Sequence, residues 1–495
     1  MSQERFLALD LGAESGRGVV GTLSGEGKLT LEEVHRFPNG PIRMGDALHW
    51  DLPRIVTECR TAIGKAATGG LLQSIGVDTW GVDFGLIGSH GELVGLPYHY
   101  RDPRMNGSVE KTFARVPKET VFSKTGIQTM QINTLFQLAV LAERSPKLLD
   151  AAQTLLFIPD LLHYYLTGRA ESEYTIASTS QMLDATTRTW ATDILHTLGL
   201  PTSLLPNVLP AGSEYGTLLP TEAELTGAGP VSIIAPGGHD TACAVAAVPA
   251  QGDGWAYLSS GTWSLLGVEI QDPVLTSQAA EANVTNEGGV DGTIRLLKNI
   301  AGLWLVQECR RSYTRLGSER TYDQLTRLAA EATPLAAVID PDHPSLLAPP
   351  DMPRAIRDLC AATGQTPPEG IGATIRCCLE SLGLKYRAVL GTMEKLTNQR
   401  IHTLHIVGGG SQNKLLNQIA ANATGCRVIV GPIEATAIGN VLLQAKAKGH
   451  IASLADLRAI VRASFETEVY EPDAAQKSQW DDIYNSATAP SGIFQ

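Results

Sequence analysis

The stretch FLALDLGAESGRGVV, residues 6–20, places two apolar runs on either side of a polar, glycine-bearing centre. Each apolar run has about the length of a β-strand, so the stretch predicts a strand, a tight turn and a second strand. The centre, residues 10–18, carries three glycines, two acids, a serine and an arginine. Turn glycines let backbone N–H groups approach an anion closely. The stretch therefore indicates either a phosphate-binding hairpin or an ordinary hairpin with a solvated arginine.

A second strand–turn–strand pattern lies at residues 254–270, GWAYLSSGTWSLLGVEI. Two similar hairpins in the two halves of the chain favour a duplicated domain. A chain of 495 residues is long enough for two hydrophobic cores. The small, turn-rich segment 248–254 suits a boundary, and we expect an N-terminal domain of residues 1–248 and a C-terminal domain of residues 249–495.

Strand-like and helical patterns alternate along the rest of the chain. Apolar runs end in glycine-bearing turns in IGVDTWGVDFGLIG, VSIIAPGGHD and IHTLHIVGGGSQN. Apolar residues at helical spacing predict one helix over 371–396, and a second is predicted over 414–423, ending at Gly425. Strands mixed with helices predict an α/β protein.

Composition excludes several classes of protein. The net charge of −12 opposes a nucleic acid or an anionic membrane as main partner. The seven cysteines are scattered without a CxxC pair, which disfavours structural zinc and fits reduced thiols. The start, MSQERF, does not read as a secretory signal, and the most apolar stretch, residues 155–166, is too short to span a membrane. We expect a cytoplasmic protein.

The stretch VDTWGVDFGLI, residues 77–87, gathers two acids and an indole near a glycine. Carboxylates accept hydrogen bonds from sugar hydroxyls, and an aromatic face covers C–H surface. This combination suits a polyhydroxylated ligand. An exposed turn with a half-buried tryptophan fits the pattern equally well.

The stretch IIAPGGHDTACAVAA, residues 233–247, runs from an apolar strand through two glycines into a helix of small residues. Asp240 or Thr241 would serve as an ordinary N-cap here. Alternatively, Asp240 is a ligand-facing base that the helix dipole keeps ionised.

Three consecutive glycines follow the strand in LHIVGGGSQN, residues 404–413. A tight strand-to-helix turn would explain one or two of them. Three favour the close approach of a flat or phosphorylated ligand to the backbone.

The order of these motifs, together with TNEGG at 285–289 and LKNIAGLWLVQE at 297–308, resembles that of the FGGY carbohydrate kinases over essentially the whole chain. The motifs are most similar to those of the members that act on L-rhamnulose. The resemblance implies two duplicated domains of the actin/hexokinase (ribonuclease H-like) fold with a central cleft between them. Sugar would bind mainly to the first domain and ATP mainly to the second.

The resemblance also implies roles for individual residues. Asp240 matches the proton acceptor, and Asp10 resembles the acid near Mg²⁺. The residues that match ATP-binding positions are Ala13, Glu14, Ser15, Gly16, Arg17, Thr262, Gln307 and Gly409. The residues that match sugar-binding positions are Gly81, His239, Asp240, Thr241 and Asn299. Glu14 is an unusual anion within a phosphate loop, and we expect its side chain to point away from the phosphates or to pair with a cation.

The implied activity is transfer of a phosphoryl group from ATP to the 1-hydroxyl of L-rhamnulose, with Mg²⁺ as cofactor. Three alternatives stay open: a kinase for another ketose or sugar acid such as L-fuculose, xylulose or gluconate, an actin- or heat-shock-type ATPase, and a sugar sensor without catalysis. The ATPase alternative needs a module for a protein partner, and we expect none in the short stretch after residue 470.

Overall fold

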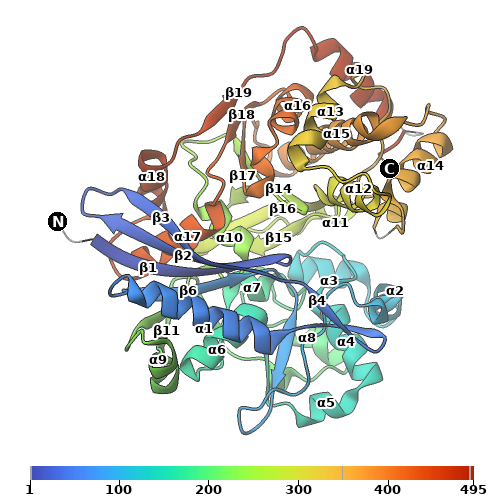
Figure 1. Cartoon of the computed structure of the whole chain (residues 1–495). Coiled ribbons are helices and arrows are strands. Elements are labelled where there is room, and N and C mark those ends of the chain that lie inside the picture. The colour runs from blue at the N-terminus through green and yellow to red at the C-terminus, as the bar shows by residue number, and fades with distance from the viewer. Residues whose placement is uncertain (1–2, 348, 490–491, 495) are drawn as a thin grey trace. The chain divides into compact units, whose positions relative to one another are not determined.

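The computed structural model describes residues 3–347, 349–489 and 492–494. The chain divides into two compact units, each built from separate segments. The first unit comprises Met1–Pro249, Glu269–Leu296 and Ala435–Phe465, and the second comprises Ala250–Val268, Leu297–Glu434 and Glu466–Gln495. Figure 1 labels the elements of both.

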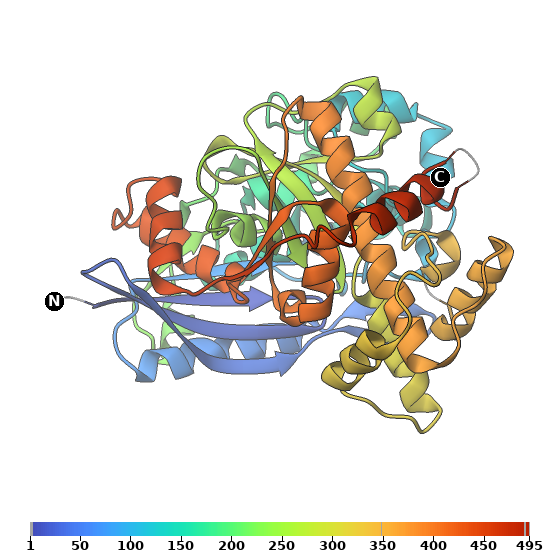
Figure 2. The ribbon, with the colours of Figure 1, turned by 90° about the horizontal axis from the view of Figure 1, so that it is seen from above.

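The first unit is built around a six-stranded sheet with the order β11-β12-β6-β1-β2-β3. The strands of this unit are β1 Gln3–Leu11, β2 Ser15–Ser24, β3 Leu29–Pro38, β4 Pro41–Met44, β5 Ala47–Trp50, β6 Ser74–Thr79, β7 Phe84–Ile87, β8 Thr154–Phe157, β9 Ser172–Glu173, β10 Val208–Leu209, β11 Ser213–Thr217, β12 Ser232–Ala235 and β15 Thr285–Gly288. Figure 2 shows β1 to β3, in blue, as a twisted antiparallel ribbon.

Helices of the first unit cover both faces of this sheet. They are α1 Leu52–Thr68, α2 Ser108–Phe113, α3 Lys118–Thr125, α4 Thr134–Arg144, α5 Pro146–Ala151, α6 Ile158–Thr167, α7 Tyr174–Ser178, α8 Thr192–Thr197, α9 Pro220–Thr226, α10 Asp240–Ala246, α11 Ser277–Glu281, α17 Ala435–Ala447 and α18 Leu454–Ser464. Apolar residues of α1 and α6 pack with those of β1, β6 and β12 in one core.

Glycines of β2 set how closely helices approach the sheet. A Cβ on Gly18 would lie 2.6 Å from the Cβ of Ala62 on α1, and a Cβ on Gly21 would lie 2.4 Å from Val441 on α17. Because side chains alternate between faces along a strand, these two glycines admit α1 on one face and α17 on the other.

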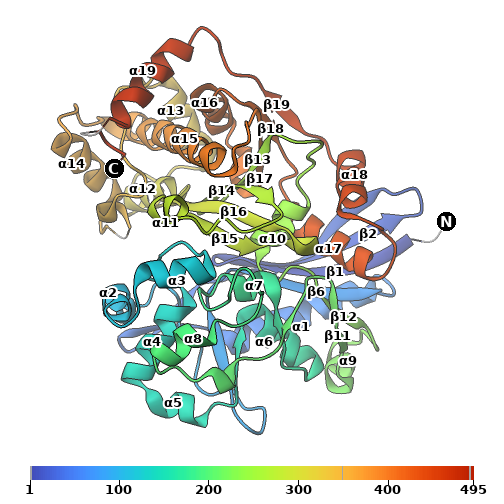
Figure 3. The same ribbon diagram turned by 180° about the vertical axis from the view of Figure 1, so that it is seen from behind.

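The second sheet has the order β15-β16-β14-β13-β17-β18-β19. The division between the units falls within β14 and β16. The remaining strands are β13 Trp255–Ser260, β14 Trp263–Ile270, β16 Ile294–Ala301, β17 Thr403–Val407, β18 Arg427–Val430 and β19 Glu468–Tyr470. The helices of the second unit are α12 Trp304–Arg315, α13 Tyr322–Glu331, α14 Met352–Ala362, α15 Gly370–Thr397, α16 Lys414–Thr424 and α19 Lys477–Ala487. Figure 3 shows α15 beside α16, against which it packs.

The two sheets repeat one pairing pattern. In the first, β1 pairs antiparallel with β2 and parallel with β6, β6 is parallel to β12, and β12 is antiparallel to β11. In the second, β13 pairs antiparallel with β14 and parallel with β17, β17 is parallel to β18, and β18 is antiparallel to β19. The predicted α/β fold with a duplicated domain is confirmed.

The predicted helices are also confirmed. The helix predicted over 371–396 is α15, and the helix predicted over 414–423 is α16. Gly425 follows the last residue of α16 and has the left-handed conformation. Within the described part of the chain, no helix has the length and apolar content needed to cross a bilayer.

Candidate active site

The turn of the first hairpin is held by its own backbone and by Asn39, which directly follows β3. Gly12 N donates to Ser15 O at 2.9 Å. The side chain of Asn39 donates to Gly12 O at 2.8 Å, and its backbone N–H donates to Glu14 O at 2.9 Å. Glu14 itself is exposed. The turn is therefore fixed in shape while its tip faces solvent.

Asp10 and Arg17 stand opposite each other in the β1–β2 register. Arg17 Nη2 donates to Asp10 Oδ2 at 2.5 Å, with the two side chains 17% and 8% exposed. The sequence predicts Arg17 as a phosphate contact and Asp10 as the acid near magnesium. The structure pairs the two side chains with each other, which places a cation and an anion together at the base of the turn.

Asp10, Asp78 and Asp240 are near enough for their charges to interact. Asp78 is the parallel neighbour of Asp10, on β6. It is fully buried; Oδ2 accepts from Asn440 Nδ2 at 2.6 Å, and Oδ1 has no hydrogen-bond partner. Burial, followed by the charge of Asp10, raises the pKa of Asp78 well above its usual range. An acidic patch of this kind suits a cation bound partly by other ligands.

Asp240 is the first residue of α10 and is placed by the two-glycine turn that follows β12. Its Oδ1 accepts from Thr241 N at 2.6 Å and from Thr241 Oγ1 at 3.1 Å. His239 Nε2 lies 3.3 Å from the same oxygen. The Asp240 side chain keeps 30% of its surface exposed. One carboxylate oxygen is thus held by donors beside a partly open side chain.

Asp240 is the first residue of the seven-residue helix α10, and the interpretation that the helix dipole keeps it ionised stays a prediction. Burial is the largest influence and raises the pKa of Asp240; His239 lowers it, and the charge of Asp10 raises it further. A raised pKa makes the carboxylate a stronger base than a free aspartate.

A buried glutamate that no sequence motif indicates positions the Gly238–His239 backbone. Glu173 Oε2 accepts from Gly238 N at 2.7 Å, and the same carboxylate accepts from Thr175 N at 2.8 Å. Thr175 Oγ1 in turn accepts from His239 N at 3.2 Å. Glu173 is fully buried, which raises its pKa. No local pattern around Glu173 signals this contact.

Gly81 follows β6 in a turn that approaches α7 closely. A Cβ on Gly81 would lie 3.3 Å from the side chain of Thr179, and Thr179 Oγ1 accepts from Val82 N at 3.2 Å. Val82 has a positive φ of 67°. The strands predicted around this turn, β6 and β7, belong to different sheets.

Asp83 organises the interior beside this turn and is not exposed to a ligand. It is fully buried, and Trp80 is 6% exposed. Asp83 Oδ2 accepts from Trp50 Nε1 at 2.6 Å and from Trp80 Nε1 at 3.1 Å, while Oδ1 accepts from Gln137 Nε2 at 2.8 Å. Neither the sugar-contact interpretation nor the exposed-turn interpretation of Asp83 and Trp80 holds.

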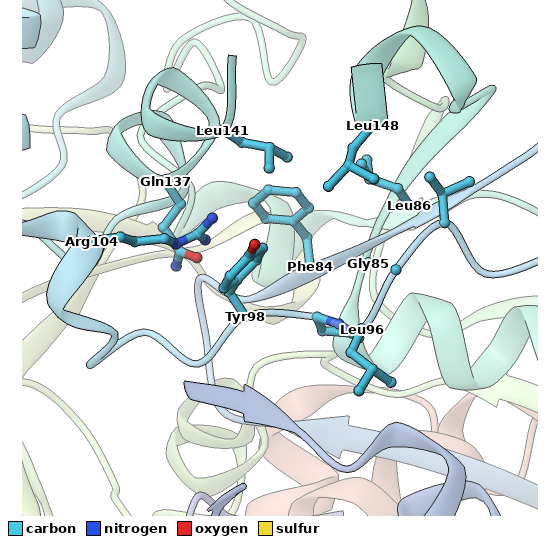
Figure 4. Close-up of a pocket in the computed structure, with 12 residues that line it drawn as sticks. Phe84, Gly85, Leu86, Leu96, Tyr98, Arg104, Gln137, Leu141 and Leu148 are labelled. Carbon is cyan, nitrogen blue, oxygen red and sulfur yellow. The ribbon is translucent and has the colours of Figure 1, made fainter. Parts of the chain in front are cut away.

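A pocket lies next to this buried group (Figure 4). Its walls are mostly apolar, with Phe84, Leu86 and Leu141 among them. Arg104, Gln137 and Tyr98 are its polar members, and the guanidinium carbon of Arg104 lies 3.4 Å from the centre of the Tyr98 ring. None of the residues predicted as site residues lines this pocket.

In the second unit, the turn of the second hairpin rests on the start of α12. Gly261 O accepts from Leu303 N at 3.0 Å, and Thr262 O accepts from Trp304 N at 3.1 Å. Gln307 Nε2 donates to Thr262 Oγ1 at 3.2 Å. Two residues predicted to bind ATP, Thr262 and Gln307, are therefore in direct contact.

The triple glycine follows β17 and passes close to the end of β13. A Cβ on Gly408 would lie 2.9 Å from Ser260 O, and one on Gly410 would lie 2.2 Å from Ser260 Oγ. The middle residue, Gly409, is exposed and would meet nothing within 4 Å. Close packing explains two of the three glycines, and Gly409 is the one left open to a ligand.

The predicted site residues fall into two groups. Residues 10–17, Gly81 and residues 239–241 belong to the first unit. Thr262, Asn299, Gln307 and Gly409 belong to the second, with Asn299 half-buried on β16.

Solved structures share this fold. A xylulose kinase from Lactobacillus acidophilus superposes with a TM-score of 0.82 at 16% identity, covering 99% of this chain and 100% of the other. A Plasmodium falciparum glycerol kinase solved with ADP gives a TM-score of 0.78 at 15% identity, covering 100% and 99%. At these identities the similarity concerns the fold.

Sequence comparison gives the family. The N-terminal and C-terminal domains of the FGGY family of carbohydrate kinases match residues 6–247 and 256–448. This chain belongs to the FGGY family of carbohydrate kinases. The resemblance that the motifs suggested is confirmed, and the chain is that of an enzyme that phosphorylates a sugar with ATP as co-substrate.

Curated FGGY relatives cover nearly the whole chain. A rhamnulokinase of Bacteroides thetaiotaomicron is 44% identical over 97% of this chain and 98% of its own length. A rhamnulokinase of Pectobacterium atrosepticum is 40% identical over 99% of each.

Proposed function

We propose that this FGGY kinase transfers the γ-phosphoryl group of ATP to the 1-hydroxyl of L-rhamnulose, giving L-rhamnulose 1-phosphate and ADP in the breakdown of L-rhamnose. The observation that carries the chemistry is Asp240, whose Oδ1 is held by Thr241 while the side chain stays 30% exposed. The choice of sugar is supported by the full-length similarity to curated rhamnulokinases.

Asp240 acts as the general base in this proposal. The sugar O1 forms a bond to the γ-phosphorus as the bond from that phosphorus to the β–γ bridging oxygen breaks, and the hydroxyl proton passes to Asp240 Oδ2. In a loose transition state the proton leaves late, so an oriented carboxylate suffices. The raised pKa of Asp240 suits this task.

ATP would be held by residues 13–17 of the first hairpin and by Thr262, Gln307 and Gly409. Backbone N–H groups of both turns and the Thr262 hydroxyl would stabilise charge that develops on the phosphoryl group. Residues 1–248 would bind mainly the sugar, and residues 249–495 mainly ATP.

Mg²⁺ fits the acidic patch of the first unit. Magnesium is usually bound through one or two carboxylates, waters and phosphate oxygens, and Asp10 with the orphaned Oδ1 of Asp78 offers such donors. Within the described residues, no group of three His, Cys, Asp or Glu side chains could hold a metal by itself. Asp10 would hold the ion, which when bound neutralises phosphate charge.

The sugar would contact Gly81, His239, Thr241 and Asn299. Backbone placement by Glu173 and Thr175 keeps His239 and Asp240 in one fixed arrangement.

Reduced thiols also support a cytoplasmic location, since all seven cysteines are free and buried.

The test is a coupled ADP-release assay with Mg²⁺ and ATP across L-rhamnulose, L-fuculose, L-ribulose, D-xylulose and glycerol. Strong preference for L-rhamnulose is the expected result. Turnover on another ketose would discard the proposed sugar and keep the role of Asp240. ATP hydrolysis without a sugar, or sugar binding without phosphoryl transfer, would overturn the proposed reaction.

A further inference from the structure

His239 lies between Asp240 and a buried ion pair of the first unit. Its Nε2 is 3.3 Å from Asp240 Oδ1. Its Nδ1 is 3.2 Å from Glu287 Oε2 and 3.2 Å from Arg295 Nη2. Glu287 comes from β15 and Arg295 from β16. A carboxylate and a guanidinium therefore meet at the same nitrogen of the ring, while the other nitrogen faces the proposed base.

Contacts with Gly288 and Glu287 hold the Arg295 side chain in place beside the His239 ring. Its side chain is fully buried, Nε donates to Gly288 O at 2.9 Å, and Nη1 is 3.2 Å from Glu287 Oε2. The Glu287 side chain is 6% exposed. A guanidinium stays protonated and can only donate. Its contact with Nδ1 is therefore favourable only when Nδ1 carries a lone pair.

The ring has three protonation states to choose among. With a proton on Nδ1, it would donate to Glu287 and oppose Arg295. With both nitrogens protonated, it would sit between two carboxylates and still oppose Arg295. With the proton on Nε2, it accepts from Arg295 and donates towards Asp240. The third state satisfies the contacts of Arg295 and Asp240, and the pairing of Arg295 with Glu287 offsets the repulsion between the Nδ1 lone pair and Glu287 Oε2.

We propose that Arg295 is a positioning residue that keeps the His239 proton on Nε2, so that the ring donates to Asp240 Oδ1. That oxygen already accepts from Thr241 N and Oγ1, at 2.6 and 3.1 Å. Three donors on Oδ1 leave Oδ2 to take the proton of the sugar hydroxyl. The inference rests on the proposed role of Asp240 as the base.

The first experiment reads the proton position directly. Full-length enzyme labelled with ¹⁵N-histidine is examined by long-range ¹H–¹⁵N correlation at pH 8, and the His239 signal is assigned by its loss in His239→Gln. We expect a neutral ring protonated on Nε2. A ring protonated on Nδ1, or on both nitrogens, would overturn the proposal. This measurement needs no substrate, so it stands or fails separately from the identity of the sugar.

The second experiment links the proton position to turnover. Arg295→Met removes the donor to Nδ1, and we expect the proton to move to Nδ1 and kcat to fall roughly 10-fold or more, with KM for ATP unchanged. Arg295→Lys keeps a donor and should restore part of kcat and the Nε2 proton. If Arg295→Met does not fold, the spectrum and kcat of Arg295→Lys carry the test.

Arg458→Met is the matched control, because Arg458 forms another largely buried ion pair in the same unit, 3.0 Å from Glu269. It should lower the melting temperature while leaving kcat and the His239 signal unchanged. If Arg295→Met lowered only the melting temperature, with kcat within twofold of wild type and the proton still on Nε2, Arg295 would have a structural role and the proposal would fail.

Discussion

Asp83 and Asp240 show how differently two carboxyl groups of one unit are used. Both carboxylate oxygens of Asp83 accept hydrogen bonds, from the indoles of Trp50 and Trp80 and from the amide of Gln137, and its side chain is fully buried. Asp240 commits Oδ1 to donors from its own turn and keeps a partly exposed side chain. Asp83 holds the interior together, whereas Asp240 is arranged to react.

Asp240→Asn should reduce kcat by roughly 10² to 10⁴-fold, since an amide cannot accept the hydroxyl proton. The coupled ADP-release assay measures this. Asp358→Asn serves as the control, because that side chain is 71% exposed on α14, and it should turn over like the wild type. An Asp240→Asn enzyme within twofold of wild type would refute the base assignment.

Asp83 should make stability depend on pH. Burial raises its pKa to about 7 from 3.8 and outweighs the hydrogen bonds from Gln137, Trp50 and Trp80. Between those pH values, Asp83 of the folded protein holds a proton that the unfolded chain has lost. The contribution of Asp83 to the free energy of unfolding therefore falls as pH rises from about 4 to 7, and it is constant above about pH 7.

Urea unfolding of wild type and Asp83→Asn across pH 4 to 8 measures this dependence. The free energy of unfolding of the wild type, relative to the variant, should drop by on the order of 4 kcal/mol over that range. A difference that stays flat or rises with pH would show that Asp83 is ionised throughout.

At the residue scale, local sequence identified the residues that sit in turns. Gly237 and Gly238, before His239, and Asp10, near the end of β1, mark positions where a strand stops. The end of a strand can be recognised from a short stretch of sequence. Glu173, Glu287 and Arg295 act on the same turn from distant strands. Their contacts depend on tertiary packing, so nothing adjacent to them in sequence indicates a role at the site.

At the scale of elements, helix packing depends on positions that exclude a side chain. Gly439 on α17 crosses α10 so closely that a Cβ would lie 1.9 Å from Cys243 O. Backbone cannot yield as a flexible side chain can. Gly391, inside α15, would place its Cβ in open space. Both glycines lie inside a helix, but only at Gly439 would a Cβ clash with the backbone of another helix.

Gly439→Ala should lower the free energy of unfolding by about 1–3 kcal/mol or more, because overpacking forces the two helices apart. Gly391→Ala should raise it by up to about 1 kcal/mol, because alanine loses less backbone entropy in a helix. Thermal or urea unfolding of both variants tests the pair. Equal effects would show that the α10–α17 contact does not limit packing.

Periodicity predicted α15 and α16 well, because long amphipathic helices with a glycine stop carry a strong local signal. It was less informative for VDTWGVDFGLI. The two strands there are real, but β6 and β7 pair in different sheets. Which partner a short apolar strand finds is decided by the rest of the fold, which a local window does not contain.

At the scale of the molecule, the seven cysteines are all free and all buried. Burial raises the pKa of Cys59 to about 12 and that of Cys243 well above its usual range. Since the thiolate is the reactive form, the folded enzyme should react with Ellman's reagent far more slowly than the unfolded chain, in which all seven thiols are accessible. Rapid reaction of the native enzyme at pH 8 would contradict this burial.

The repeat of one hairpin in each half indicated duplication, and both sheets share one order of pairing. The sequence could not indicate that Glu269–Leu296 and Ala435–Phe465 pack with the first unit. That membership comes from contacts such as those of Asn440 and Gln444 with Gly76 and Leu7, which join residues far apart along the chain.

The return of α17 to the first sheet limits how such a gene can be recombined. A fragment ending at Pro249 encodes β1, β6 and β12 but lacks the helix that lies over Gly21 and Gly76. Its sheet would present an unprotected apolar face and invite aggregation. Recombining the two duplicated domains by a cut at residue 249 would therefore separate the first sheet from α17. A circular permutant that carries residues 435–465 ahead of β1 would retain a complete first sheet.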